Sequence, residues 1–392
     1  MENKIKKNYL SIIRGTCFLF SFNLQYFLRI VVVYLLAVGV EPWVAVSIPI
    51  VFEFARSGIE SFKPFMKLSV KVNFKYCNIV HILIFLALGF FITQCRTVWT
   101  IYPLVTLMGV TTGIKYGACL KLYTQNKKLE SVCLICDERT FALGSIFGLL
   151  VSQFVYDFNP ILYIIGFGVL LVVEIIISIF FKQAPKEDIM TEETTKLTKK
   201  ERNDVLKTTI PFGIFVGTCW VALFAFDELA PLLSDKIGYF GVFRFVVTIL
   251  VTLLITGKVI KKIKEKEKLM LTQLILMVIS VVAIAISALT QNWIGLIISF
   301  SLMGICYAVG DPLRCSMMSV LSQDNRNKWV LMSSTYYKIK TLFIGVAWFA
   351  ARECVLNGIS AFVWLAAGVF VLSVIFFLIS NIINKKVINT TI

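Results

Sequence analysis

Long apolar stretches separated by short polar segments run along almost the whole chain. A helix needs about 20 apolar residues to cross the hydrocarbon core of a bilayer. Windows of that length predict twelve transmembrane helices, six in each half of the chain. The predicted ranges are 10–38, 42–62, 75–94, 99–121, 136–156, 160–181, 208–232, 238–257, 269–289, 292–313, 330–351 and 359–383. The sequence therefore predicts an all-helical integral membrane protein.

The composition agrees with this interpretation. Of the 392 residues, 58% are hydrophobic and 16% are charged, whereas soluble domains carry about 25% charged residues. The chain lacks the polar side chains that a water-facing surface needs. A soluble globule, a disordered chain and a disulfide scaffold are excluded, because each requires a different composition.

Lysine and arginine are distributed unevenly between the connecting segments. Most lie near the two termini and in the even-numbered connections, whereas the short odd-numbered connections hold Arg96, Lys236 and Arg352. Cytoplasmic loops carry such an excess of basic residues. We therefore expect both termini on the cytoplasmic side of the cell membrane. The net charge of +16 reflects this topology, and no nucleic-acid partner is expected.

A charged segment near the midpoint divides the chain. Residues 183–207 are rich in lysine and in acidic residues, so they cannot enter the bilayer and predict a cytoplasmic linker. Residues 1–182 are then an N-terminal six-helix bundle, and residues 208–392 are a C-terminal six-helix bundle.

Two loops carry a glycine followed by basic residues. One runs from Gly257 to Lys264 after the eighth predicted helix, and a weaker copy follows Gly58 after the second. With the two six-helix bundles and the charged linker, these loops resemble the major facilitator superfamily of secondary transporters, whose signature has an acid where this chain has Lys261. The resemblance covers essentially the whole chain. It implies two halves that rock about a solute site near the middle of the bilayer.

Charged residues inside predicted spans are the first candidates for function, because an ionised side chain at the bilayer centre costs about 2.5–3.5 kcal/mol on insertion scales. The resemblance implies that the first, fourth, seventh and tenth helices line the solute path. In the first helix, Asn23, Tyr26 and Arg29 share one face. Arg29 can hold a carboxylate or phosphate bidentately. The alternative is that Arg29 pairs with a neighbouring acid or extends to the interface.

The second and fourth helices add further candidates. Thr112, Lys115 and Tyr116 in the fourth helix are predicted solute contacts, unless Lys115 reaches the cytoplasmic interface. In the second helix, Glu53 has Arg56 three residues on and Glu60 beyond it, which predicts a salt-bridge network. Glu53 lies nearest the middle of that span and is a candidate for proton coupling.

The second half offers a similar set. Trp220 in the seventh helix is a predicted solute contact, and Asp227 seven residues on is a candidate protonation site if it is buried, or an interfacial acid if it is not. In the tenth helix, Tyr307 and Arg314 are predicted to contact solute, and Asp311 to bind solute or a proton. The alternative for Asp311 and Arg314 is an ion pair.

One helix pair is expected to pack closely. Gly144 and Gly148 in the fifth predicted span have the spacing of small residues that lets two membrane helices approach each other.

Chemistry other than transport has little support in the sequence. His81 is the single histidine, so neither a catalytic triad nor a multi-histidine metal site is expected. Cys133 and Cys136 have CxxC spacing without a second pair, which ten cysteines can produce by chance, although a redox or metal role is the alternative. A phosphate-binding loop for ATP is also missing.

These observations predict a secondary active transporter and not an enzyme. We expect it to move a small polar organic solute, anionic or zwitterionic, by alternating access coupled to protons. The expected partners are that solute, membrane lipid and the coupling proton, with no cofactor. Two alternatives stay open: a transporter-shaped sensor or accessory protein without net flux, and an exporter of lipids or drugs.

Overall fold

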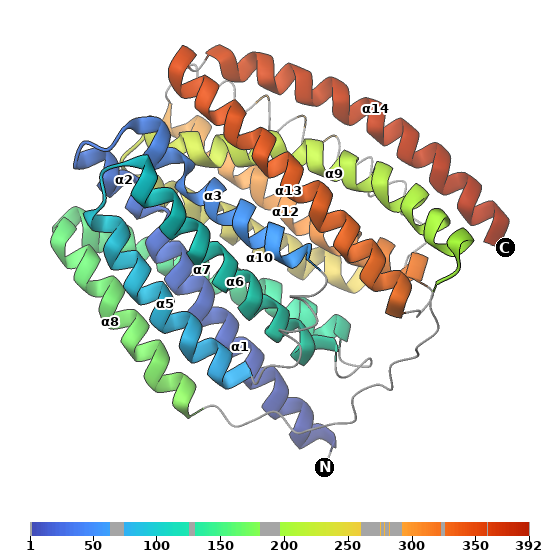
Figure 1. The fold of residues 1–392 in the computed structure, drawn as a ribbon, viewed down its shortest axis with the longest axis horizontal. Coiled ribbons are helices and arrows are strands. Elements are labelled where there is room, and N and C mark those ends of the chain that lie inside the picture. The colour runs from blue at the N-terminus through green and yellow to red at the C-terminus, as the bar shows by residue number, and fades with distance from the viewer. Residues whose placement is uncertain are drawn as a thin grey trace. The chain divides into compact units, whose positions relative to one another are not determined.

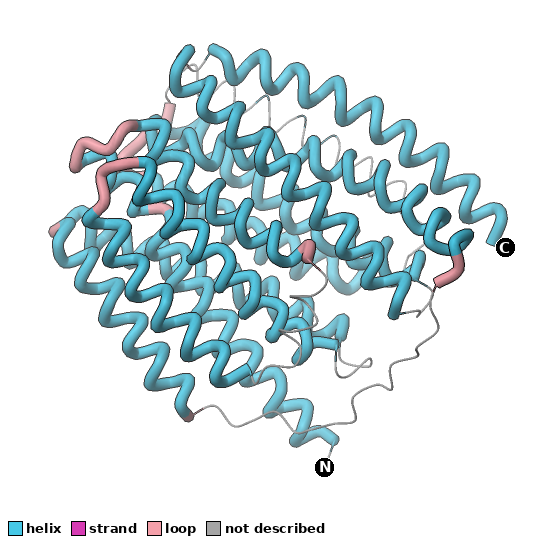
Figure 2. The backbone as a smooth tube through the Cα atoms, in the orientation of Figure 1, coloured by secondary structure: helices cyan, strands magenta, loops and turns pink. Residues whose placement is uncertain are grey.

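The computed structural model describes residues 2–62, 74–124, 130–180, 197–259, 292–322, 326–358 and 360–391, with three single residues between 275 and 282. Nearly all of these residues are helical, and this part of the chain contains no strand (Figure 2). The predicted all-helical fold is confirmed.

The chain divides into two compact units. Figure 1 labels the helices that make them up. The first unit comprises Met1–Glu192 and Ser234–Ile249, and the second comprises Glu193–Leu233 and Leu250–Ile392. The first unit contains α1 (Glu2–Leu28), α2 (Ile30–Ala37), α3 (Pro42–Glu60), α5 (Phe74–Gln94), α6 (Val98–Thr124), α7 (Glu130–Phe158), α8 (Pro160–Ile179) and the start of α10 (Ile237–Val259). The second contains α9 (Lys199–Leu233), the end of α10, α12 (Trp293–Ser322), α13 (Arg326–Asn357) and α14 (Ser360–Thr391).

The observed helices follow the predicted spans closely. Every predicted range except the ninth coincides with a described helix, and α1 and α2 together cover the first range. The ninth range, 269–289, lies almost entirely outside the described residues, as does most of the predicted linker at 183–207. The count of twelve spans and the placement of the linker therefore stay predictions.

Several of these helices are suited to a membrane by length and composition. Among the described residues, six helical segments are long and apolar enough to cross a bilayer. They are Arg14–Ala37, Phe74–Gln94, Arg139–Phe158, Pro160–Ile179, Lys199–Leu233 and Ile237–Leu254. The protein is a multi-pass membrane protein.

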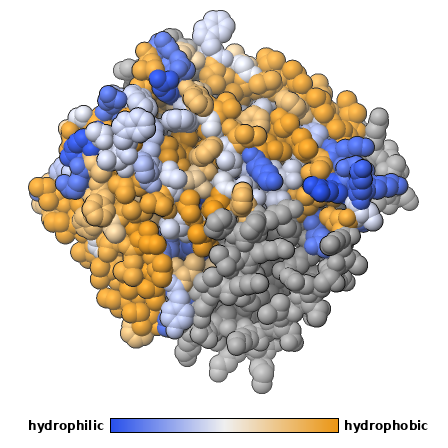
Figure 3. All heavy atoms as spheres, in the orientation of Figure 1, coloured by the Kyte–Doolittle hydropathy of each residue, from blue (hydrophilic) through white to orange (hydrophobic). Residues whose placement is uncertain are grey.

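Helix α8 shows how the sequence adapts to lipid. Its buried positions recur every three or four residues and include Glu174 and Ser178. The exposed large apolar residues of α8 are Ile161, Leu162, Ile165, Val169, Val172, Val173, Ile176, Ile177 and Ile179. Polar groups therefore point inward and aliphatic groups outward, which is the arrangement that hydrocarbon favours. Figure 3 shows a molecular face that is largely apolar where it is described.

The first predicted span is interrupted in its second half, because α1 and α2 meet at Arg29. The Tyr163 hydroxyl on α8 donates to the Phe27 carbonyl at 2.9 Å, and the Tyr26 hydroxyl donates to the Tyr163 carbonyl at 3.0 Å. The two tyrosines thus attach the interrupted helix to α8.

Capping residues fix the starts of two helices. Asn159 accepts a hydrogen bond from Ile161 N at 2.8 Å, just before α8. Before α9, the Thr198 hydroxyl accepts from Glu201 N while the Glu201 carboxylate accepts from Thr198 N at 3.0 Å, which is a capping box. Helix α9 consequently begins at Lys199, inside the segment predicted as linker.

The predicted close packing at Gly144 and Gly148 is confirmed. Helix α7 lies along α1, and a Cβ added at either glycine would overlap the carbonyl oxygen of Phe18 or Phe22 on α1. In the second unit, Gly213 and Gly217 on α9 lie in the same way against side chains of α13. Each unit therefore contains a helix pair in close contact at two glycines, against backbone in the first unit and against side chains in the second.

The segment Ser234–Ile249 belongs to the first unit, although the sequence predicted it as part of the second bundle. Gln153 on α7 donates to the Asp235 carbonyl at 3.0 Å and accepts from Gly238 N at 2.8 Å. Lys236 Nζ lies 2.9 Å from Asp157 Oδ1. The hydrogen bond to Asp157 raises the pKa of Lys236, so the pair keeps its stabilising effect below the usual lysine value and loses it only in more alkaline solution.

Replacing Gly148 with leucine should destabilise the fold. We expect Gly148→Leu to cost about 1–3 kcal/mol or more, because the side chain would enter the α1 backbone. Gly368→Leu is the matched control, since an added Cβ there has no neighbour within 4 Å. Thermal unfolding in detergent measures both, and an equal melting temperature for the two variants would contradict the packing account.

Candidate functional site

Polar side chains from several helices meet inside the first unit. Asn23 on α1 donates to Glu174 Oε2 on α8 at 2.5 Å, and Lys115 Nζ on α6 lies 3.6 Å from Glu174 Oε1. Asn23, Lys115 and Glu174 are each at most 3% exposed. We call these three residues the buried polar cluster. An ion pair at this depth loses its hydration and persists only where the two charges compensate each other.

The surroundings of this cluster are partly aromatic. Lys115 Nζ lies 4.4 Å from the centroid of the Phe20 ring, which attracts the cation. On α5, Asn78 donates to the Ser178 hydroxyl at 2.8 Å. His81, one turn further along α5, is buried against the Phe20 and Phe85 rings. The single histidine therefore lies at the edge of the buried polar cluster. The sequence alone did not indicate a role for it.

The predicted face of the first helix is divided by the structure. Asn23 joins the buried polar cluster, whereas Tyr26 is 1% exposed and stacks on Tyr163 with ring centroids 5.2 Å apart. Arg29 is half-buried at the junction of α1 and α2. The three residues therefore have different surroundings.

The predicted residues of the fourth span lie on α6. Thr112 is buried, and its hydroxyl donates to the Met108 carbonyl of its own helix at 2.8 Å. Tyr116 is half-buried. Lys115 points into the bundle toward Glu174, so the alternative that it extends to the cytoplasmic interface is wrong for this structure.

The predicted salt-bridge network on α3 is present along that helix. Arg56 Nη2 lies 2.7 Å from Glu53 Oε2, and Arg56 Nε lies 3.9 Å from Glu60 Oε1. Glu53 is half-buried and Glu60 is buried. Glu53 therefore interacts with a neighbouring cation in this conformation.

In the second unit, aromatic residues surround Trp220 on α9. The Trp220 ring is stacked near Phe224 and meets Tyr307 of α12 edge-on, at a centroid distance of 4.4 Å. Asp227 on the same helix is 2% exposed. This burial favours the predicted inward position of Asp227 over an interfacial one. Lys340 of α13 also lies near the Trp220 ring. The sequence did not single out this lysine.

Two predicted residues have no described side chain. Asp311 and Arg314 lie within helix α12, but their side chains are outside the described part of the structure. Their roles, and the alternative of an ion pair between them, stay predictions.

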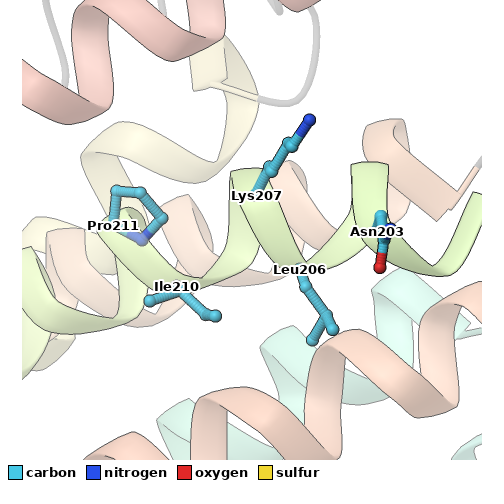
Figure 4. Close-up of a pocket in the computed structure, with 5 residues that line it drawn as sticks. All are labelled: Asn203, Leu206, Lys207, Ile210 and Pro211. Carbon is cyan, nitrogen blue, oxygen red and sulfur yellow. The ribbon is translucent and has the colours of Figure 1, made fainter. Parts of the chain in front are cut away.

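A shallow depression of about 310 Å³ lies on the N-terminal part of α9 (Figure 4). Its lining residues are Asn203, Leu206, Lys207, Ile210 and Pro211. A solute site needs polar groups that converge from several elements. Because all five residues belong to one helix, we do not assign this depression to the solute.

Comparisons with known proteins agree with this architecture. The family model described as Major Facilitator Superfamily matches residues 139–327. A POT family transporter, crystallised with a thioalcohol-conjugated peptide, superposes with a TM-score of 0.76 at 11% identity, over 95% of this chain and 96% of that chain. A POT family transporter with 5-aminolevulinic acid gives 0.75 at 12% identity, over 95% and 96%. The nucleoside transporter NupG gives 0.70 at 11% identity, over 96% and 99%. No curated protein sequence matches the chain.

A bundle of apolar helices that encloses charged residues, in a fold shared with solute carriers, defines a membrane transporter rather than an enzyme. Residues 139–327 therefore match the superfamily that the sequence resembles, and the fold of nearly the whole chain is the one that these solved transporters share.

Breaking the buried ion pair should destabilise the first unit. We expect Lys115→Met or Glu174→Leu alone to cost about 3–5 kcal/mol, because each leaves one buried charge uncompensated. The double variant should recover much of that loss. Lys236→Ala is the control, since its partly exposed pair with Asp157 should contribute about 0–1 kcal/mol. Denaturant or thermal unfolding measures all four, and additive losses in the double variant would exclude a compensated pair.

Proposed function

We propose that this chain is a secondary active transporter with twelve transmembrane helices and both termini in the cytoplasm. It moves a small polar organic solute, anionic or zwitterionic, across the cell membrane. Transport proceeds by alternating access of two six-helix halves and uses the proton gradient. Residues 183–207 join the halves on the cytoplasmic side.

The burial of charged residues within each unit carries this proposal. Lys115, Glu174 and Asp227 are all nearly inaccessible inside helices that otherwise present apolar side chains outward. Such residues are costly in a membrane and are typical of substrate or ion pathways.

The chemistry of the candidates favours a solute that carries a carboxylate. Arg29 and Lys115, the latter paired with Glu174, are the cations among the first-unit candidates, and Asn23, Tyr26, Thr112 and Tyr116 are the neutral polar candidates. Two fold neighbours are transporters crystallised with a peptide conjugate and with 5-aminolevulinic acid. Solutes of that kind combine an amine with a carboxylate, which cations and acids in a shared pathway can recognise together.

Proton coupling is assigned to the acids. Asp227 is buried, Asp311 lies near the Pro312 of α12, and Glu53 is paired with Arg56. Burial favours the neutral form of a carboxyl group, and access to water favours the charged form. A change of access during the transport cycle therefore loads and releases a proton at such a residue. In the second half, Trp220, Tyr307 and Arg314 complete the solute contacts.

Flux into liposomes tests this function. A thermal-shift screen of metabolites first identifies solutes that stabilise the purified protein, because a ligand that binds the folded state raises its melting temperature. A radiolabelled hit should then enter liposomes when a pH gradient is imposed, and the gradient should increase the initial rate. Binding without solute flux or proton movement would contradict carriage and indicate the sensor alternative.

Variants test the site assignment separately. Arg29→Ala and Asp311→Ala should each abolish uptake while the amount of folded protein is unchanged. Arg96→Ala is the control, because this arginine is exposed in a connecting segment and should transport normally. Retained transport in both site variants would remove the assignment, even if the protein proved to be a transporter.

A further inference from the structure

The depression on α9 lies where that helix changes from polar to apolar. Helix α9 begins at Lys199, before the predicted span 208–232. In the depression, Asn203 and Lys207 precede that span, whereas Ile210 lies inside it. The first turns of α9 therefore extend beyond the predicted hydrocarbon core, and the depression is expected at the level of the lipid headgroups.

The depression is on the outward side of α9. Val205, Thr209 and Phe212 lie on the opposite face of the helix and are buried. In the depression itself, Lys207 is exposed and Ile210 is 40% exposed. This side of α9 consequently faces away from the buried core of the second unit, where a membrane protein meets lipid.

The lining of the depression is polar at one end and aliphatic at the other. Asn203 and Lys207 provide an amide and an ammonium group toward the start of α9. Ile210 and Pro211 follow toward the apolar part of the helix, and Leu206 lies between the two ends. In Figure 4, Lys207 projects from the helix on the side opposite to Leu206 and Ile210. A molecule that joins an anionic group to a hydrocarbon chain fits this order along the helix axis.

Positive charge gathers on the same helical face. Lys199 and Lys200 are exposed, and by the helical period they share the face of Asn203 and Lys207. Asp204 is exposed at the edge of this face and offsets one of the three lysines. The face is therefore cationic beside the depression, and it attracts a phosphate.

The other acid of this turn is directed elsewhere. The Glu201 carboxylate accepts from the Thr198 hydroxyl at 2.9 Å and lies 3.3 Å from Lys328 Nζ on α13. Because Glu201 is two to three residues out of step with Lys199 and Asn203, the helical period puts it on the other side of α9. It does not neutralise the lysines beside the depression.

The sequence around the depression is typical of lipid recognition. Lys196, Lys199, Lys200, Arg202 and Lys207 precede the predicted span closely. A basic cluster next to the cytoplasmic end of a membrane helix is typical of binding to anionic lipids, which are concentrated in the cytoplasmic leaflet. The uneven distribution of lysine and arginine predicts that this end of α9 is cytoplasmic.

We propose that the depression on α9 binds an anionic phospholipid of the predicted cytoplasmic leaflet. The lipid phosphate lies against the Lys207 ammonium and the Asn203 amide, and one acyl chain lies along Ile210 and Pro211. The ligand class is phospholipids with a net negative headgroup. This inference does not depend on the proposed transport function, because the site faces lipid and not the solute path.

Lipid retention tests the inference on the full-length protein in detergent. Native mass spectrometry counts the molecules that stay bound, and the probes are phosphatidylglycerol and phosphatidylcholine with the same acyl chains. The wild type should retain more phosphatidylglycerol than phosphatidylcholine. Lys207→Gln should retain about one phosphatidylglycerol molecule fewer, since a phosphate loses its charge-assisted hydrogen bond. Arg202→Gln is the matched control and should retain as many as the wild type, because this exposed arginine is on another face of α9.

A second pair of variants tests the acyl chain. Ile210→Asn should also lose about one phosphatidylglycerol molecule, because a polar side chain disfavours contact with hydrocarbon. Leu232→Asn is its control, since this exposed leucine is near the far end of α9. Melting curves without added lipid show that each variant is folded. Glycerol 3-phosphate has the phosphate but no chain, and it should not displace the bound lipid.

Each other outcome overturns the inference or one part of it. Unchanged retention in Lys207→Gln, or an equal loss in Lys207→Gln and Arg202→Gln, would show that no specific phosphate site exists at Lys207. Equal retention of the two lipids would overturn the anionic class. Displacement by glycerol 3-phosphate, or full retention in Ile210→Asn, would indicate a phosphate site without a seated acyl chain. Solute flux is measured separately, so the transport function and this lipid site can fail independently.

Discussion

Hydrocarbon forms no hydrogen bonds with charged groups or with the backbone, so these groups must find their partners within the protein. This constraint shapes the entire structure. Helix α8 illustrates the result, because its aliphatic residues face outward while Glu174 faces inward and pairs with Lys115. The Tyr163 hydroxyl on α8 likewise finds its partner inside the bundle, where it donates to the Phe27 carbonyl. Polar chemistry is therefore concentrated inside the bundles, where a carrier needs it.

Both units use glycine pairs to bring two helices together. In the first unit Gly144 and Gly148 of α7 lie against the α1 backbone, and in the second Gly213 and Gly217 of α9 lie against α13. These are the first and fifth predicted helices of each half, although the glycines are on opposite partners. Van der Waals packing drives association in lipid, so small residues are the simplest means of close contact. The repeated pairing is what two related six-helix halves would show.

The spans could be predicted from sequence because hydrophobic length is a local property of the chain. The start of α9 was also readable from Thr198 and Glu201, which form a capping box, but high charge there indicated a linker. Contacts between helices were not readable. The helical period predicted which face of its helix Asn23 occupies. It could not predict the hydrogen-bond partner of Asn23, because Glu174 lies 151 residues away in the chain. Lys340 was missed for the same reason, since Trp220 is on another helix.

The central claim is that lipid surrounds the bundles while the aromatic and charged residues near the solute path face inward. Fluorescence quenching by lipids brominated at mid-chain tests it in variants that keep one tryptophan. Trp220 and a tryptophan introduced by Val371→Trp both lie near the middle of a predicted span, but Trp220 is 8% exposed and Val371 is 55% exposed. The account predicts strong quenching at position 371 and little at Trp220. Equal quenching at the two positions would contradict it.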